Sequence, residues 1–263
     1  MKNFFVIGDS TSQSLSPTIF NHWFKVYNIQ AKYSFIEVKK NNFEKVLLNK
    51  INDENTFGFN ITTPFKKNIF KHIDITNNHS KKIGAINCVK VSKKTRGINT
   101  DWVGYLNSTK DFKINKSKNV IVLGYGGASK AIIYGLLYKG FKSVLVFNRS
   151  KKQIKLKERK TFTKQYKTVD KYLVNAGLII NTTPTNPLNK KQTKLIGKDM
   201  IVSDIVYAPK NTPFLSPLKE NRKIYGISML IEQAIPCFYY WFGFKPKVDK
   251  VLIKKLNAKI KKW

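Results

Sequence analysis

Short apolar runs alternate with longer amphipathic segments in the N-terminal part of the chain. The apolar runs predict strands, and the segments between them carry apolar residues at helical spacing. The predicted strands are Phe4–Gly8, Tyr33–Val38, Phe57–Thr62 and Ala85–Val91. The predicted helices are Thr18–Tyr27, Asn42–Leu48 and Phe65–His72. Pro17 and Pro64 stand where the first turn of a helix tolerates proline.

A second series of apolar runs begins near residue 119. Its predicted strands are Val120–Leu123, Ser143–Phe147, Leu178–Asn181, Met200–Ile205 and Lys223–Gly226. These runs are short and continuously apolar, as is typical of parallel strands that are covered on both faces. Helical stretches separate the early runs, and this alternation predicts an α/β fold with a parallel sheet.

Two domains are expected, with a boundary near Thr100–Ser117, because the strand series restarts there. The chain of 263 residues is 42% hydrophobic, which is enough to build two cores. The strongly basic segment Ser150–Val169 is typical of a solvated helix. The last part, Leu230–Trp263, predicts a helix, a break at Gly243–Pro246 and then a lysine-rich helix.

The sequence gives no sign of a membrane segment or a metal site. No apolar run approaches the roughly 20 residues that a membrane helix needs. The apolar start, Met1–Asp9, is too short for a signal peptide. Cys88 and Cys237 are far apart and form no Cys-x-x-Cys pattern, so both are expected to be buried thiols. We therefore expect a cytoplasmic protein with no membrane partner and no metal.

The charge balance is strongly positive, with 49 basic and 15 acidic residues and a net charge of +34. Clustered lysines would indicate a nucleic-acid-binding protein, because they release counterions from phosphate backbones. Coding bias explains the charge as well, because lysine is abundant together with asparagine and isoleucine. The lysines are spread from end to end, and no basic segment carries the interleaved aromatic residues of a stacking surface. The sequence thus favours coding bias over specific nucleic-acid binding, although the charge should attract small anionic ligands.

A glycine-rich turn between a predicted strand and a predicted helix lies within Asn119–Ala131. Gly124 would permit the tight turn, and Gly126 would let the backbone approach phosphate groups. The N-terminus of the following helix would offer unpaired N–H groups to them. Ser129 replaces the third glycine of the usual fingerprint. In this strand–turn–helix context the segment predicts an oxidoreductase that binds a dinucleotide.

The end of the next predicted strand indicates which dinucleotide is bound. An acidic residue there accepts the ribose hydroxyls in NAD-binding domains, but this chain has Asn148 and Arg149 instead. The turn could also be basic only because the whole chain is basic. The missing acid nevertheless favours NADP over NAD. The residues of these two segments that are expected to contact the cofactor are Gly124, Gly126, Gly127, Ala128, Asn148, Arg149, Ser150 and Lys151.

Reduction of a carbonyl group by hydride needs a proton donor for the developing alkoxide. His22, His72 and His79 lie in amphipathic or polar stretches, which predicts surface positions. Lys66 follows a predicted strand at the expected start of a helix, where the helix dipole would disfavour its charged form. Asp101 is one of few acids and lies among loop-forming residues. It is the best candidate for a carboxylate that holds the Lys66 ammonium in place.

Six segments in order along nearly the whole chain resemble the shikimate dehydrogenase family. Ser12–Pro17 with Asn21 resembles its substrate-binding Ser-x-Ser-Pro segment, and Asn60–Lys66 resembles its Asn-Val-Thr-x-Pro-x-Lys motif. Gly84–Asn87 resembles Gly-Ala-x-Asn-Thr, and Asn99–Asp101 resembles Asn-Thr-Asp. The remaining two are Asp204–Tyr207 with Thr212 and Pro213, and Gly226 with Met229–Ala234.

The resemblance implies NADPH-dependent, reversible reduction of 3-dehydroshikimate to shikimate, a step of chorismate and aromatic amino-acid biosynthesis. It implies Lys66 and Asp101 as catalytic residues, and Ser14 and Ser16 as ligands of the substrate carboxylate. The substrate-binding residues that it implies are Ser14, Ser16, Thr62, Asn87, Asp101, Tyr207 and Gln233. It implies Ile205 and Gly226 as further contacts of the cofactor. The protein would act on this small molecule as a monomer or homodimer.

The resemblance also implies a two-domain α/β fold. An N-terminal α/β substrate-binding domain, residues 1–100, would be completed by C-terminal helices within 230–263. Residues 101–229 would form a Rossmann-like, doubly wound NADP-binding domain.

The chain departs from the family pattern at several positions. Cys88 replaces the usual threonine after Asn87, and Asp9 replaces a usual proline-containing turn. Ser228 replaces a glycine, and the segment from Asn181 lacks a glycine that often follows. Because no proposed catalytic group is lost, the enzyme interpretation stands. Three alternatives remain open: a quinate/shikimate dehydrogenase that uses NAD, a non-catalytic nucleic-acid-binding relative, and a non-catalytic small-molecule sensor.

Overall fold

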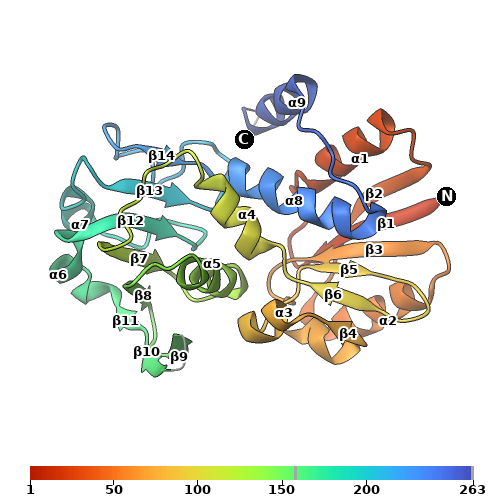
Figure 1. Cartoon of the computed structure of the whole chain (residues 1–263), viewed down its shortest axis with the longest axis horizontal. Helices are drawn as coiled ribbons and strands as arrows, with labels where there is room; N and C mark the ends of the chain where they lie inside the picture. Colours follow the sequence, from red (N-terminus) through yellow and green to blue (C-terminus); the bar gives the residue numbers. More distant parts are fainter. Residues whose placement is uncertain (157–158, 262–263) are drawn as a thin grey trace. The chain divides into compact units, whose positions relative to one another are not determined.

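The computed structural model describes residues 1–156 and 159–261, and the chain forms two compact units. The first unit consists of Met1–Asp101 and Gln233–Lys259, and the second consists of Trp102–Glu232 with residues 260–261. The chain leaves the first unit at the start of helix α4 (Asp101–Ser108) and re-enters it within helix α8 (Gly226–Phe242). Both units contain helices and strands, as Figure 1 shows.

The first unit is built on a mixed sheet with strand order β2-β1-β3-β5-β6-β4 (Figure 1). Its strands are β1 (Lys2–Gly8), β2 (Ala31–Glu37), β3 (Thr56–Ile61), β4 (Ile75–Thr76), β5 (Cys88–Lys90) and β6 (Arg96–Ile98). Strand β1 is parallel to β2 and β3, whereas β5 is antiparallel to β3 and β6. Its helical segments, besides the larger part of α8, are α1 (Ser16–Val26), η1 (Lys40–Asn42), α2 (Phe43–Asn52), η2 (Asn68–His72), α3 (Asn78–Ile83) and α9 (Lys250–Ile260).

Strand β1 separates two packed layers, because successive side chains of a strand point to opposite faces. Phe4 lies against the rings of Phe24 and Trp241, with ring centroids 5.4 and 4.8 Å away. Phe5, on the other face, belongs to a buried cluster with Leu47 of α2. The continuous apolar run that predicted this strand therefore reflects burial of both of its faces.

The segment Phe65–His72 is not the α-helix that the sequence predicts. A turn carries the chain to the short 3-10 helix η2, which begins at Asn68. The carbonyl oxygen of Lys66 accepts a hydrogen bond from the backbone N–H of Ile86 at 2.8 Å, so it does not bond within a helix. The ring of Phe65 stacks on that of Phe43 at 4.0 Å. Tertiary contacts thus replace the first helical turn.

The second unit is built on a parallel sheet with strand order β11-β8-β7-β12-β13-β14. Its strands are β7 (Asn119–Leu123), β8 (Val144–Asn148), β11 (Lys164–Gln165), β12 (Ala176–Asn181), β13 (Ile201–Asp204) and β14 (Lys223–Ile224). Its helical segments, besides α4 and the start of α8, are α5 (Gly127–Tyr138), η3 (Tyr166–Thr168), α6 (Asp170–Leu173) and α7 (Lys190–Lys194).

Helices cover both faces of this parallel sheet. Val120 and Val122 of β7 belong to a buried cluster with Ile132 of α5. Ile121, between them, belongs to a second cluster with Leu173 of α6. The predicted α/β class with a doubly wound, Rossmann-like parallel sheet is confirmed.

The basic segment Ser150–Val169 is not the solvated helix that the sequence predicts. It contains an antiparallel hairpin of β9 (Gln153–Leu156) and β10 (Arg159–Phe162), followed by β11 and η3. Ile154 is only 3% exposed and lies in a buried cluster, so this face of β9 is anchored by the core. The period-two alternation of Ile154 and Leu156 with polar residues was the signal for a strand. Residues 157–158 lie outside the described residues.

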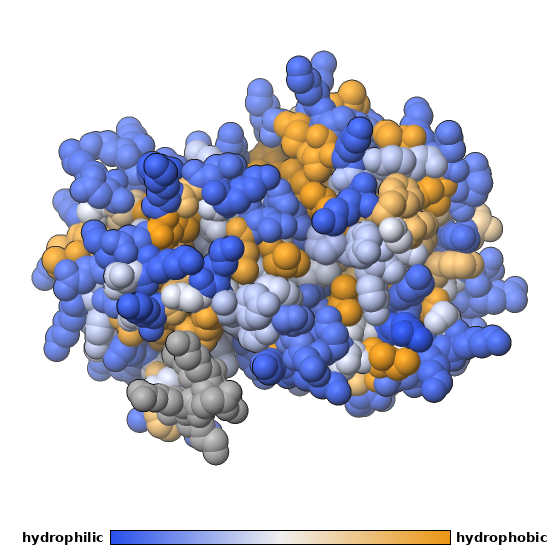
Figure 2. All heavy atoms as spheres, viewed as in Figure 1, coloured by the Kyte–Doolittle hydropathy of each residue, from blue (hydrophilic) through white to orange (hydrophobic). Residues whose placement is uncertain are grey.

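Lysine side chains cover part of the aromatic surface. The Lys2 ammonium lies 4.8 Å from the ring centroid of Phe57, and that of Lys50 lies 5.0 Å from the ring of Phe5. Long basic side chains can bury their methylene stems while the charge stays in water. Hydrophilic residues are spread over both units on the face drawn in Figure 2. Within residues 1–156 and 159–261, no helix has the length and apolar character needed to cross a membrane.

Hydrogen bonds between the loops before β4 and β6 make the stability of the fold depend on pH. Thr95 donates to Asp74 Oδ2 from its backbone N–H at 2.7 Å and from its hydroxyl at 2.8 Å. These bonds lower the pKa of Asp74 below its ordinary value. The stabilisation is therefore complete above the unfolded-state pKa of about 4 and is lost as pH falls through the lower folded-state value.

We expect Asp74→Asn to lower the urea midpoint at pH 6, because the amide accepts these bonds more weakly. The difference from wild type should shrink as the pH falls below about 4. Urea unfolding followed by circular dichroism at both pH values measures this, with Glu54→Gln as the control. A difference that stays constant with pH would contradict the assignment.

Candidate active site

A buried ion pair between Lys66 and Asp101 lies at the centre of the candidate site. Lys66 Nζ donates to Asp101 Oδ2 at 2.6 Å, and the two side chains are 12% and 6% exposed. Lys66 lies in the turn after β3, and Asp101 is the first residue of α4. Because Lys66 is not in the first turn of a helix, the predicted influence of a helix dipole on it is wrong. The structure does bring the two residues together.

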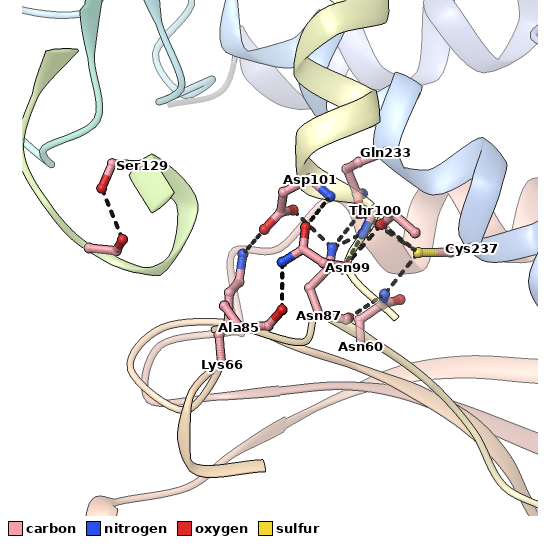
Figure 3. Close-up of polar contacts among 11 residues, drawn as sticks. Asn60, Lys66, Ala85, Asn87, Asn99, Thr100, Asp101, Ser129, Gln233 and Cys237 are labelled. Atoms are coloured by element: carbon pink, nitrogen blue, oxygen red, sulfur yellow. Dashed lines mark hydrogen bonds and ion pairs between the residues drawn. The ribbon is translucent and has the colours of Figure 1, made fainter. Parts of the chain in front are cut away.

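Asn87 orients the carboxylate of Asp101. Its Nδ2 donates to Asp101 Oδ1 at 2.9 Å, so each carboxylate oxygen has its own donor. Its Oδ1 accepts from the backbone N–H of Thr100 at 2.7 Å, which fixes the rotamer of the amide. Figure 3 shows these side chains pointing toward one another. The ionised form of Asp101 is thereby satisfied on both oxygens, as a buried carboxylate requires.

The loop that leads into α4 is held by Asn99. Asn99 Nδ2 donates to the carbonyl oxygen of Ala85 at 2.9 Å, and Asn99 Oδ1 accepts from the backbone N–H of Asp101 at 3.0 Å. The backbone N–H of Asn99 donates to Ser80 Oγ at 2.8 Å. The sequence shows Asn99 only as part of a motif. The structure shows that it positions Asp101.

A buried polar network continues from Asn87 to helix α8. Thr100 Oγ1 lies 3.1 Å from Cys237 Sγ, and Asn60 Nδ2 donates to the same sulfur at 3.2 Å. Gln233, one turn before Cys237, takes part through its Oε1, 3.4 Å from Asn87 Nδ2 and from Thr100 Oγ1. The network joins β3, the start of α4 and α8, three parts that are distant in sequence (Figure 3).

Both cysteines are free and buried, as the sequence predicts. Burial raises the pKa of the Cys88 thiol well above its usual range, with the neighbouring Cys237 as a further cause. Cys88 therefore favours the neutral thiol in this network.

The loops after β1 and β3 carry three more of the predicted residues. Ser16 begins α1, and its backbone N–H donates to Ser14 Oγ at 3.3 Å. Thr62 follows β3, and its backbone N–H donates to the carbonyl oxygen of Ile7 at 2.9 Å. A Cβ on Gly8 would lie 2.3 Å from Thr62 Cγ2, so the two loops approach closely. Because β1 and β3 are parallel, both loops leave the same edge of the sheet.

The glycine-rich turn of the second unit has the geometry that its sequence predicts. Gly124 has a φ of +100°, and a Cβ there would lie 2.6 Å from Thr182 Oγ1. Gly126 precedes the first turn of α5, and no atom lies within 4 Å of a Cβ built on it. Ser129, in place of the third glycine, donates from Oγ to the carbonyl oxygen of Gly126 at 2.9 Å. The turn and the N-terminus of the 12-residue α5 suit a pyrophosphate group.

The turn after β8 is basic and internally bonded. Asn148 Nδ2 donates to the carbonyl oxygen of Ser150 at 3.0 Å, and Thr163 Oγ1 donates to the same oxygen at 3.1 Å. Lys151 lies over the ring of Phe162 at 4.6 Å. Burial raises the pKa of Tyr166, and the nearby charge of Arg149 opposes that rise. The sequence from the end of β8, Asn148–Lys152, contains no acidic residue, so the turn suits a phosphate group.

The remaining predicted residues also lie in the second unit. Tyr207 lies on the loop after β13. A Cβ on Gly226 would lie 2.5 Å from the carbonyl oxygens of Ile205 and Val206, so only glycine fits there. Ile205 and Gly226 are thus neighbours, beyond the ends of β13 and β14.

The prediction of a surface position is wrong for His22. This side chain is buried, and its Nε2 lies 2.9 Å from Asp249 Oδ2. Lys255 Nζ lies 3.2 Å from its Nδ1. Both partners come from the α9 region, far away in sequence, so local polarity gave no sign of this burial. His72 and His79 are half-buried.

Comparison with known proteins gives the family of the chain. Residues 6–89 match the shikimate dehydrogenase substrate binding domain, and residues 107–212 match the shikimate/quinate 5-dehydrogenase domain. A shikimate dehydrogenase (NADP(+)) of Caldicellulosiruptor bescii is 35% identical over 273 residues, covering 98% of this chain and 95% of that protein. This chain belongs to the shikimate dehydrogenase family. The family predicted from the six sequence segments is confirmed.

Two further comparisons agree. A shikimate dehydrogenase (NADP(+)) of Aquifex aeolicus is 37% identical over 254 residues, with 90% of both chains covered. A crystal structure of shikimate dehydrogenase from the same organism superimposes with a TM-score of 0.84 at 30% identity, covering 97% of each chain. The similarity extends through both units.

The buried ion pair provides a second test of stability. Removing one partner leaves the other charge buried without compensation, which costs about 3–5 kcal/mol. We therefore expect Lys66→Met and Asp101→Leu each to lower the free energy of unfolding by about 3 kcal/mol. The double variant should lose clearly less than the sum, because it leaves no buried charge. Chemical unfolding of the four proteins gives the coupling energy, and additive losses would contradict this account.

Proposed function

We propose that this chain is a shikimate dehydrogenase that catalyses the NADP-dependent interconversion of 3-dehydroshikimate and shikimate. The observation that carries the proposal is the buried Lys66–Asp101 pair, oriented by Asn87, in a chain of this family. Relatives such as the protein of Caldicellulosiruptor bescii bear the name of that activity and of NADP(+). Such a pair can hold a proton ready for an oxygen atom that gains charge as a carbonyl group is reduced.

In this proposal the loops after β1 and β3 bind the substrate. The hydroxyls of Ser14 and Ser16 bind its carboxylate. Thr62, Asn87 and Gln233 hydrogen-bond its ring hydroxyls, and Tyr207 also lines the substrate site. Short hydroxyl and amide groups suit a polyhydroxylated acid, because buried polar groups left without partners penalise analogues that lack a hydroxyl. Residues 1–100 with the helices of 230–263 would form the substrate-binding domain.

Lys66 acts as the acid in reduction and as the base in oxidation. Its ammonium donates a proton to the alkoxide oxygen that develops on the substrate, and its neutral amine takes the hydroxyl proton in the reverse direction. Asp101 holds Lys66 Nζ at a fixed position, and Asn87 holds Asp101. NADPH, when bound, supplies the hydride that adds to the carbonyl carbon.

Residues 101–229 would bind NADP. The turn formed by Gly124, Gly126, Gly127 and Ala128 would hold the pyrophosphate at the N-terminus of α5. Arg149, with Asn148, Ser150 and Lys151, would bind the 2′-phosphate, because a guanidinium matches the geometry of a phosphate. Ile205 and Gly226, which are neighbours, would contact the remainder of the cofactor.

Replacing Lys66 tests the acid–base role. We expect Lys66→Met to lower kcat by about 10²- to 10⁴-fold, which is the usual contribution of general acid–base catalysis. Shikimate oxidation is followed at the NADPH absorbance, and shikimate binding is measured by calorimetry. The control is Lys67→Met, since Lys67 is the exposed neighbour on the same turn. The role would be refuted if Lys66→Met kept wild-type kcat.

Replacing Arg149 tests the choice of cofactor. Wild type should have a higher kcat/KM with NADP than with NAD. Arg149→Ala should lower kcat/KM for NADP by about 10- to 100-fold and leave the value for NAD nearly unchanged, because the lost contact is charge-assisted. Lys139→Ala, at an exposed lysine after α5, serves as the control. Wild-type preference for NAD would point instead to a quinate/shikimate dehydrogenase.

A further inference from the structure

The loop between β1 and α1 is held by a carboxylate from a different strand. Glu37 is the last residue of β2, and it pairs with Gly8 at the end of β1. Its Oε1 accepts three hydrogen bonds of 2.8 Å, from the backbone N–H groups of Thr11 and Ser12 and from Ser12 Oγ. A carboxylate that accepts bonds from two successive backbone N–H groups fixes the direction of both peptide planes. Such charge-assisted bonds are stronger than neutral ones.

The loop contains a buried polar group that opposes its shape. Between Asp9 and Ser16 the sequence has no proline that would restrict the backbone. Thr11 is 1% exposed, yet its buried Oγ1 has no hydrogen-bond partner among the residues that the structure describes. An unpaired buried hydroxyl opposes this conformation. The bonds to Glu37 therefore have to compensate for it.

The residues that Glu37 holds are bonded in turn to the two serines. The backbone N–H of Ser14 donates to the carbonyl oxygen of Thr11 at 2.9 Å. Ser14 Oγ then accepts from the backbone N–H of Ser16 at 3.3 Å, at the start of α1. The contacts thus run from Glu37 through Thr11 to Ser14 and Ser16. A second ion pair, between Lys39 and Asp9 at 3.1 Å, joins the same two chain segments but is largely exposed.

We propose that Glu37 is a positioning residue for substrate binding. It fixes the backbone at Thr11 and Ser12, so that the hydroxyls of Ser14 and Ser16 are held ready for the substrate carboxylate. This inference rests on the proposed function, because it takes Ser14 and Ser16 to be the carboxylate ligands. Glu37 itself does not contact the reacting atoms. Its removal should therefore weaken binding of shikimate and leave the chemical step and the cofactor largely unaffected.

The test compares three variants with wild type. Glu37→Ala should raise both KM and the calorimetric Kd for shikimate by about 10-fold or more, because a misplaced binding loop loses its oriented contacts. Its kcat and its KM for NADP should stay within about twofold of wild type, as expected when only binding that the ground state and the transition state share is lost. Glu37→Gln keeps an oxygen that can accept the N–H bonds, so it should restore most of the affinity. Glu37→Asp keeps the charge but is shorter by one methylene, so it should resemble Glu37→Ala.

Asp53→Ala provides the matched control. Asp53 is also a carboxylate that accepts a backbone N–H in the first unit, from Asn55 at 3.0 Å, but it lies before β3 at the opposite end of that strand. Its replacement should lower thermal stability without changing KM for shikimate. If Glu37→Ala fails to fold, Glu37→Asp gives the same comparison.

Two results would overturn the inference. One is an unchanged Kd for shikimate in Glu37→Ala. The other is an equal loss of shikimate affinity in Glu37→Ala and Asp53→Ala, which would mean a general loss of stability. Failure of the proposed function has a different signature, because wild type itself would then neither bind nor oxidise shikimate.

Discussion

The candidate site depends on the burial of one ion pair, Lys66 with Asp101. Two charges removed from water are costly unless their remaining hydrogen-bonding groups are satisfied. This requirement explains the polar residues around them. Asn87 satisfies the second carboxylate oxygen, and Asn99 fixes the backbone at Asp101. A substitution at Asn87 or Asn99 therefore changes the ion pair even where the replaced side chain does not contact Lys66.

The fold of the first unit makes this arrangement possible. Parallel pairing of β1 and β3 places the loops that follow these two strands at one edge of the sheet, and those loops carry the serines, Thr62 and Lys66. The second unit has the same arrangement in a fully parallel sheet. The turn after β7 and the turn after β8 leave the same edge of that sheet. Ligand sites at the carboxyl ends of strands are a general property of such sheets.

Local patterns in the sequence predicted most of the strands, the glycine turn and the family, because these features depend on residues near one another in the chain. The roles assigned to Lys66, Asp101 and the other site residues stay predictions. The sequence patterns did not predict features that depend on contacts with residues far away in the chain. The Lys66 carbonyl accepts a bond from the N–H of Ile86, so the predicted helix at Phe65 does not form. The buried His22 contacts Asp249 and Lys255, which are far away in sequence. Glu37 gave no signal, because an acid at the end of a strand is ordinary until the loop it holds is known.

The lysines that lie over aromatic rings limit how this surface can be engineered. A redesign that lowers the net charge of +34 would naturally begin with exposed lysines. Lys2 over Phe57 and Lys50 over Phe5 are poor choices, because glutamate or alanine there would uncover a ring as well as remove a charge. Lys139 and Lys67 are exposed and better suited. Some of the lysines therefore cover apolar surface as well as carry charge. Removing them need not improve solubility.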